Sequence, residues 1–192
     1  MNRSRTPFVL AIANLILAMV FGLCPSSGAI AAEPLRIATF EADITPPLGS
    51  PLCDALVQPA RTIDDPLLAR GIVLFPEGEP IVLCALDWVG IGNSGYDAFR
   101  EALANAAGTK AERVAVHCLH QHDAPGCDFA ADDLLKPLGL NNELFNAAFA
   151  REAMQRIASA VSKACQSPQP VTHISLGKAK VEQVASARRV MG

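Results

Sequence analysis

The segment VAVHCLHQHDAPGC, residues 114–127, combines apolar alternation with three histidines and a Pro-Gly turn. Alternation at every second position is typical of a β-strand, whose successive side chains point to opposite faces. On such a strand His120 and His122 share one face, while His117 lies on the other. We therefore expect His120 and His122 to emerge side by side where the strand passes into the loop that begins at Asp123.

This histidine pair is a candidate metal or catalytic site. Two imidazoles two residues apart supply two of the three or four ligands that a transition-metal ion needs. Functional groups are often placed where a rigid element gives way to a loop. The alternative is that His120 and His122 are hydrogen-bonded strand residues without a function, which is our interpretation of His117. Cys118, on the His120 face, is either a soft ligand or a packing residue, and we favour packing.

Length and charge limit the classes of function. The chain has 192 residues, enough for one domain or for a piece of a larger one. Its net charge is −3, and neither sign forms a long run. Nucleic-acid binding requires a basic stripe or an aromatic stacking platform, and this chain has one Trp and one Tyr. We therefore expect no nucleic-acid partner.

Residues 1–32 have the pattern of a secretory signal peptide. Two arginines precede an apolar run at residues 8–23, and small residues follow at 26–32. The motif at residues 29–31 fits cleavage before Ala32, and cleavage before Glu33 is a close alternative. An uncleaved anchor is the competing interpretation, but the apolar run is short for a membrane span of about 20 residues.

A lipoprotein signal around Cys24 is weaker still, because Leu23 stands where a small residue is expected. We therefore expect residues 33–192 to form one exported domain, periplasmic or secreted, without a transmembrane span.

The cysteines outside the leader give no clear disulfide pattern. An oxidising compartment permits pairing, but their number is odd and none forms C-x-x-C. Cys84 lies in an apolar run and is predicted to be core. A bridge between Cys53 and Cys127 is one open possibility. The five are Cys53, Cys84, Cys118, Cys127 and Cys165.

The pattern along the chain predicts a layered α/β fold. Residues 81–88 form a continuous apolar run, which indicates burial on both faces. Strands alternating with helices imply a mixed sheet with packed helices. The expected strands are residues 34–42, 67–75, 81–88, the histidine strand, 171–177 and 178–184, and the expected helices are 96–107 and 142–165. We expect this to be an incomplete N-terminal part of a larger catalytic domain.

Several smaller features lie between these elements. Gly108 is expected to cap the first helix, and Asn141 or Asn142 the second. The polar segment 132–140 is a candidate lid or entrance loop. Asp87, at a strand exit, either serves a site or accepts hydrogen bonds from residues 90–95. His173 is expected to have no function.

Five motifs resemble the N-terminal domain of the neutral/alkaline (non-lysosomal) ceramidase family, both in their residues and in their order along the chain. The most specific is HQHDAPG at residues 120–126, which looks like the family's H-T-H-S-G/A-P-G. The others are ADITPP at 42–47, DPLLAR at 65–70, the strand end at 83–87, and ARR at 187–189, which looks like the family's N-R-R with Ala in place of Asn. Together they span nearly all of the predicted mature chain.

The resemblance implies a zinc-dependent amidase that hydrolyses the N-acyl bond of a lipid or small-molecule amide. It implies that His120 is a zinc ligand and that His122 is a catalytic neighbour that handles protons. Zinc polarises an amide carbonyl and lowers the pKa of a bound water to about 7. A neighbouring imidazole can carry the proton to the departing amine.

Two departures from the family pattern keep other functions open. Asp123 replaces the family's Ser and Cys127 its last Gly, and the family's further zinc ligands would follow Gly192. We therefore expect this portion to be inactive alone. One alternative is a non-catalytic exported module or decayed pseudo-enzyme. Another is a different metallohydrolase, such as a phosphoesterase, in which Asp43, Asp87 and Asp123 would join the two histidines in a carboxylate-rich site.

Overall fold

The computed structural model describes residues 34–180 and 182. The expected signal peptide at residues 1–32 and the ARR motif at 187–189 lie outside the described residues. All described residues belong to one compact unit, Glu33–Gly192. None of the helices in the described part is both long enough and apolar enough to cross a membrane.

The predicted mixed sheet is confirmed. Its strand order is β5-β3-β2-β1-β7, with β3 and β5 parallel and all other neighbours antiparallel. The strands are β1 (Arg36–Asp43), β2 (Leu68–Phe75), β3 (Ile81–Leu86), β5 (Val114–Cys118) and β7 (Gln169–Pro170). Two short strands, β4 (Gly90–Ile91) and β6 (Gly126–Cys127), pair separately in parallel.

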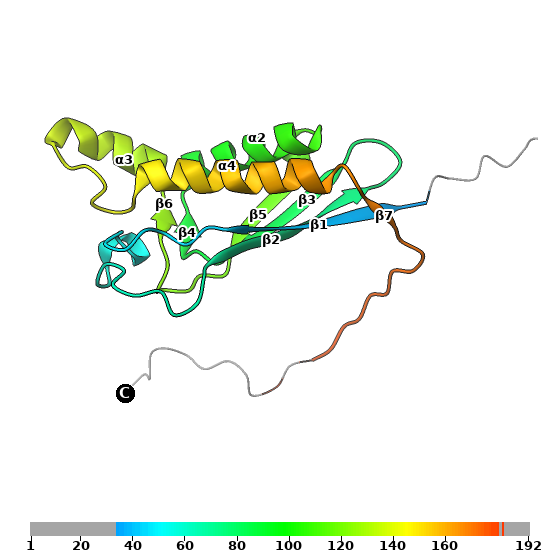
Figure 1. Cartoon of the computed structure of the whole chain (residues 1–192), viewed down its shortest axis with the longest axis horizontal. Coiled ribbons are helices and arrows are strands. Elements are labelled where there is room, and N and C mark those ends of the chain that lie inside the picture. Colours follow the sequence, from blue (N-terminus) through cyan, green and yellow to red (C-terminus); the bar gives the residue numbers. More distant parts are fainter. Residues whose placement is uncertain (1–33, 181, 183–192) are drawn as a thin grey trace, which may run out of the picture. The chain divides into compact units, whose positions relative to one another are not determined.

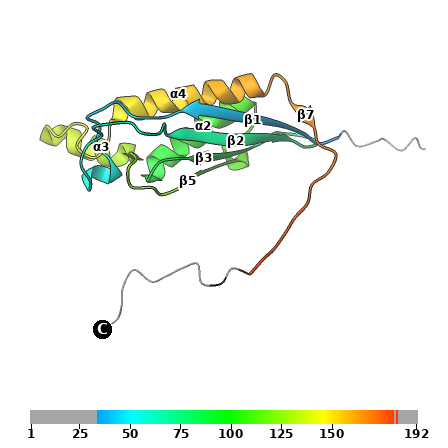
Figure 2. The same ribbon diagram turned by 60° about the horizontal axis from the view of Figure 1, so that its bottom comes forward.

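Two long helices cover one face of the sheet, so the predicted layered α/β class is also confirmed. Helix α4 packs against β1, helix α2 packs against β5, and the two helices pack against each other. Figures 1 and 2 show both on the same side of the strands. The helices are α2 (Asn93–Ala107), α3 (Phe129–Leu135) and α4 (Ala147–Ala164), with 3-10 turns η1 (Cys53–Ala55), η2 (Ala111–Arg113) and η3 (Lys136–Leu138).

The core forms between this sheet face and the helices. Every second strand residue points inward, as the two-residue period requires, and Val73, Val82 and Leu86 are fully buried. Trp88 is also fully buried and lies edge-on to Phe99, with ring centroids 5.8 Å apart. This core places the exits of the central strands rigidly.

The opposite sheet face is not covered by the described residues. Leu83, in the middle of β3, is 41% exposed there, and Arg70 and Glu41 form an exposed ion pair of 2.8 Å. The prediction that residues 81–88 are buried on both faces is therefore wrong for the described part of the chain. The physical reason is that α2 and α4 share one side.

The helix boundaries differ from the sequence pattern at their starts. Helix α4 begins at Ala147 because Asn142 has the left-handed φ of 57°, which interrupts a helix. The cap is Asn146, whose side chain accepts from the Phe149 N–H at 3.0 Å. At the end of α2 the predicted cap is confirmed, since Gly108 has φ 67°.

Two predicted segments take other forms. The segment at residues 132–140 is not a simple loop, because its first part continues α3, which Asp128 caps by accepting from Ala130 and Ala131. The predicted strand at residues 171–177 is wrong, since only Gln169–Pro170 pairs with β1. Of the expected strand at 178–184, the described residues are not in a strand, and the others lie outside the described part.

Candidate functional site

The candidate site lies at one edge of the sheet. Strands β1, β3 and β5 run in the same direction, so Asp43, Leu86 and Cys118 end them at the same edge. Figure 1 shows β4, β6 and α3 at this end of the strands. In α/β sheets, ligands bind outside the carboxyl ends of the strands.

Strand β5 ends earlier than predicted, at Cys118 rather than beyond His120. After Cys118 the chain stays hydrogen-bonded to the residues at the end of β3. The Leu119 N–H donates to the Leu86 carbonyl at 3.0 Å, and the His120 N–H donates to the Trp88 carbonyl at 3.1 Å. His120 then adopts φ 63°, a left-handed conformation that is uncommon for residues other than glycine. This conformation turns the chain into the loop that carries His122.

The two imidazoles nevertheless lie side by side. Their ring centroids are 5.3 Å apart and their planes meet at 84°. The Nδ1 of His120 lies 2.7 Å from the Val89 carbonyl oxygen. A carbonyl only accepts, so Nδ1 is the donor in this contact, and Nε2 is the nitrogen left available for another partner. Metal-binding histidines are commonly oriented by such a carbonyl.

Asp87 has a structural role. Its Oδ2 accepts from the Leu68 N–H at 2.8 Å, rather than from residues 90–95, and ties the start of β2 to the exit of β3. Its backbone carbonyl accepts from Gln121 Nε2 at 2.8 Å. Asp87 therefore positions the loop between the two histidines through its main chain.

The other candidate residues do not join the pair. Asp43 accepts from the Thr45 N–H at 2.8 Å, and hydrogen bonds from the Thr45 side chain and backbone lower the pKa of its carboxyl group. His117 is exposed on the uncovered sheet face. His173 lies in an exposed segment, where its Nδ1 is 3.0 Å from Thr172 Oγ1.

A left-handed turn contacts the loop after His122, and no sequence pattern predicted it. Residues Cys53–Ala55 all have positive φ, from 48° to 63°. The Cys53 N–H donates to the Ala124 carbonyl at 2.8 Å. The Asp54 carboxylate lies against Gly126 so closely that a Cβ at Gly126 would overlap it. A side chain at position 126 would therefore require the Asp54 carboxylate to move.

The cysteines are all free thiols in the described structure, so the possible Cys53–Cys127 bridge is not formed. Burial raises the pKa of Cys84 and Cys127 to about 12 and that of Cys118 to about 11. Cys118 packs against the core. This arrangement agrees with packing, not ligation, for Cys118.

A polar hollow of about 450 Å³ adjoins the histidine loop. Gln121 and Asp123 form one wall, and Arg61, Asp64 and Asp65 from the connection between β1 and β2 contribute to another. Its size is in the range of small-molecule sites. Neither His120 nor His122 lines it, so the hollow lies beside the pair rather than around it.

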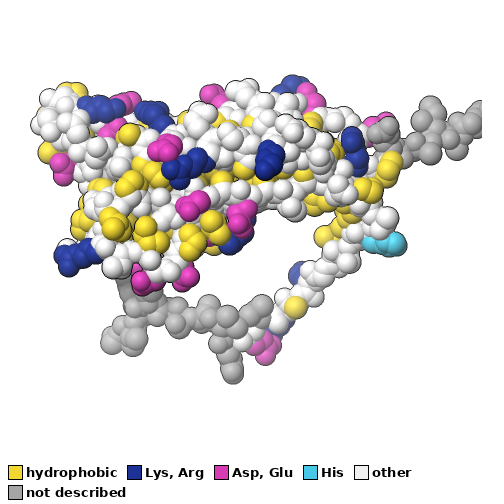
Figure 3. Space-filling view, in the orientation of Figure 1, with side chains coloured by type: hydrophobic (Ala, Val, Ile, Leu, Met, Phe, Trp, Pro, Cys, Tyr) yellow, Lys and Arg dark blue, Asp and Glu magenta, His cyan; other side chains and the backbone are white. Residues whose placement is uncertain are grey.

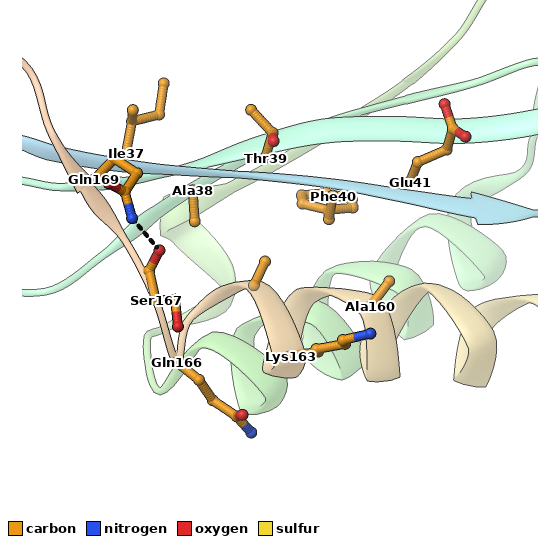
Figure 4. A pocket seen from close by; sticks show the side chains of 11 residues that line it. Ile37, Ala38, Thr39, Phe40, Glu41, Ala160, Lys163, Gln166, Ser167 and Gln169 are labelled. Atoms are coloured by element: carbon orange, nitrogen blue, oxygen red, sulfur yellow. Dashed lines mark hydrogen bonds between the residues drawn. The ribbon is translucent and has the colours of Figure 1, made fainter.

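A larger hollow lies elsewhere. It has a volume of about 540 Å³ and lies between β1 and the last turns of α4. Phe40, Glu41 and Lys163 are among the side chains that line it (Figure 4). None of the predicted site residues lines it. This hollow lies between a strand and the end of a helix, and neither His120 nor His122 lines it.

The described residues fit part of a zinc site. His120 and His122 supply two imidazoles, and the Val89 carbonyl orients one of them. Within residues 34–180, no group of three or more His, Cys, Asp or Glu side chains is placed to hold a metal ion. A zinc ion at the pair would therefore need further ligands from outside the described residues.

Comparison with known protein-family models gives no match, and comparison with curated proteins gives none either. Two similar solved structures are a neutral ceramidase from Pseudomonas aeruginosa and a ceramidase complexed with C2. Their sequence identities to this chain are 20% and 21%, both TM-scores are 0.52, and each match covers 71% of this chain. The chain matches 22% of the length of each of those proteins. It therefore shares the fold of part of these ceramidase structures.

Proposed function

We propose that this chain is the N-terminal portion of a ceramidase-like, zinc-dependent hydrolase of an N-acyl amide linkage. In this proposal His120 is a zinc ligand and His122 the neighbouring catalytic imidazole. The observation that carries it is the close histidine pair at the carboxyl edge of a sheet whose fold is shared with neutral ceramidase. The substrate would be a lipid or small-molecule amide, and the protein would be exported.

The chain's own residues have separate tasks in such a reaction. Zinc, when bound, would supply the Lewis acid that polarises the amide carbonyl. The Val89 carbonyl holds the His120 ring so that Nε2 is free to bind. As water adds to the carbonyl carbon, the His122 imidazole would take up the proton that the water loses, and as the C–N bond breaks it would deliver that proton to the departing amine.

We expect the chain alone to turn over no amide. Catalytic zinc sites usually have three protein ligands, and in this proposal the described residues supply one of them, His120. The remaining ligands would come from further polypeptide, since this chain matches 22% of the length of the similar ceramidase structures.

The second candidate is a non-catalytic exported module. It is favoured by the lack of a three-ligand group within the described residues. The phosphoesterase alternative has less support, because Asp43 and Asp87 use their carboxylates in hydrogen bonds to Thr45 and Leu68.

The test is the complete product of the native gene, assayed for zinc content and for hydrolysis of N-acyl amides and phosphoesters. We expect zinc and amide hydrolysis in the wild type and loss of both in His120→Ala. The matched control is His117→Ala, an exposed histidine in β5 that should leave both unchanged. A gene product without zinc or turnover would favour the non-catalytic module.

A further inference from the structure

The sheet face opposite α2 and α4 is apolar, and the described part of the chain leaves it uncovered. The strand registers place its outward side chains in three rows that cross the sheet, and none of these residues is buried. We call the first two rows the open sheet face. The first row is Ile37, Leu74 and Ile81, the second is Thr39, Ile72, Leu83 and Ala115, and the third is Glu41, Arg70, Ala85 and His117.

The open sheet face does not have the composition of a face made for water. Antiparallel strands with one solvated face normally alternate apolar residues inward with polar residues outward. Thr39 is the one polar member of the open sheet face. The third row is its polar border, because Arg70 and Glu41 form an exposed ion pair there and His117 is exposed. The described residues after β7 do not cover the face, since Ile174 is 68% and Leu176 96% exposed.

The outer side of the helix layer is different. Figure 3 shows basic and acidic side chains along α4, where Glu152, Arg156 and Lys163 are exposed. Charged residues on the outward side and apolar residues on the inward side are typical of a helix that faces solvent. The molecule therefore has one outer side that suits water and one that does not.

The size and residue types of the open sheet face suit an internal layer better than a separate partner. Outward side chains on a sheet are spaced about 4.8 Å by 6.8 Å, so all three rows together occupy roughly 360 Å². A stable complex between separate chains buries about 800 Å² on each partner. Such interfaces are also anchored by Trp, Tyr and Arg at their centre, whereas Ile72 and Leu83 lie at the centre of this face. Ile, Leu and Ala are the residues of a protein core.

We propose that the open sheet face is covered by a second layer of the same protein, built from polypeptide outside the described residues. This rests on the proposed function, in which the chain is the N-terminal portion of a larger hydrolase. The chain matches 22% of the length of each similar ceramidase structure, so a protein of that size has polypeptide available for such a layer. An apolar sheet face is stabilised by packing against another sheet or a helix layer. The polar third row marks the border of the covered area, on the side of the carboxyl edge.

The test is thiol labelling of the complete product of the native gene, with Leu83→Cys and Ala115→Cys as separate variants. These two residues are register partners on β3 and β5. The matched control is Ser159→Cys, at an exposed position of α4. We expect both face variants to react with a maleimide at least about 100-fold more slowly than the control, because a covered thiol reacts only after local opening. In urea all three should react alike. Fragmentation mass spectrometry assigns the label to each position, so the native cysteines do not interfere.

Three results would overturn this proposal. They are labelling of the folded face variants as fast as the control, equal protection of the control, and protection that disappears on dilution, which would assign the face to a second copy. Circular dichroism verifies folding, and Ala115→Cys carries the test if Leu83→Cys does not fold. Zinc content and amide hydrolysis are measured on the wild-type protein. Protection without zinc or turnover would leave the second layer standing and refute the hydrolase, and zinc-dependent turnover with rapid labelling would do the reverse.

Discussion

Replacing Trp88 with Phe tests whether the core supports the strand exit that carries the site. Trp88 is fully buried, and its Nε1 donates to the Ile44 carbonyl at 3.1 Å. Its own carbonyl accepts from the His120 N–H at 3.1 Å. The same residue thus joins the core to the histidine loop.

The expected cost has two parts. Phe cannot donate a hydrogen bond, so a buried carbonyl at Ile44 would be left unsatisfied, at about 1–3 kcal/mol. The smaller ring also loses contacts with Phe99 and Phe149, at about 1–2 kcal/mol. We expect the free energy of unfolding to fall by about 3 kcal/mol, a large share of the usual 5–15 kcal/mol.

Urea unfolding followed by circular dichroism measures this loss, because Trp88 is the only Trp and the variant lacks its fluorescence. The matched control is Phe99→Leu, which shortens an equally buried ring without removing a hydrogen bond and should cost about 1–2 kcal/mol. The reasoning is refuted if Trp88→Phe costs less than the control.

Three further predictions follow from individual contacts. Gly71→Ala should destabilise by at least about 2 kcal/mol in urea unfolding, because the new Cβ would overlap the Leu83 carbonyl oxygen; a neutral result would contradict the register of β2 and β3. The hydrogen bonds from Thr45 depress the folded-state pKa of Asp43, so their stabilisation is present above about pH 4 and is lost as the pH falls through that depressed pKa. The advantage of wild type over Asp43→Asn in urea midpoint should therefore shrink between pH 5 and pH 2.5, and a constant difference would refute this. The pKa of about 12 at Cys84 predicts that a thiol reagent at pH 8 labels it only after unfolding, as peptide mass mapping would show, and rapid native labelling would contradict its burial.

Local patterns predicted the central strands well, for a physical reason. Apolar runs at residues 67–75 and 81–88 and alternation from residue 114 predicted these strands, and Val73, Val82 and Val116 are buried against the helices. The parallel pairing of β3 and β5 also follows from the intervening helix α2. The fold class could therefore be predicted without knowledge of long-range contacts.

Patterns that depend on a partner were less informative. Residues 171–177 alternate like a strand, but β-propensity is realised only beside another strand, and in the described structure the pairing stops at Pro170. The exposure of the sheet face around Leu83 was not predicted either, because an apolar run does not show whether another layer of the protein packs on that face.

The candidate site was predicted in part. Two-residue spacing correctly indicated that the rings of His120 and His122 lie close together. The Val89 carbonyl and the left-handed turn at Cys53–Ala55 were not predicted, because contacts made through the main chain have no side-chain signature. The loop conformation of His120, with positive φ, was missed for the same reason.

The most direct test of the central claim is nitrogen-15 NMR of the imidazole rings of residues 33–192 during a zinc titration. The sequence has four histidines, so each ring can be followed. We predict that His120 starts with its proton on Nδ1, and that zinc shifts the rings of His120 and His122 while His117 and His173 stay unchanged. A proton on Nε2 of His120, or a response to zinc confined to His117 or His173, would contradict the account.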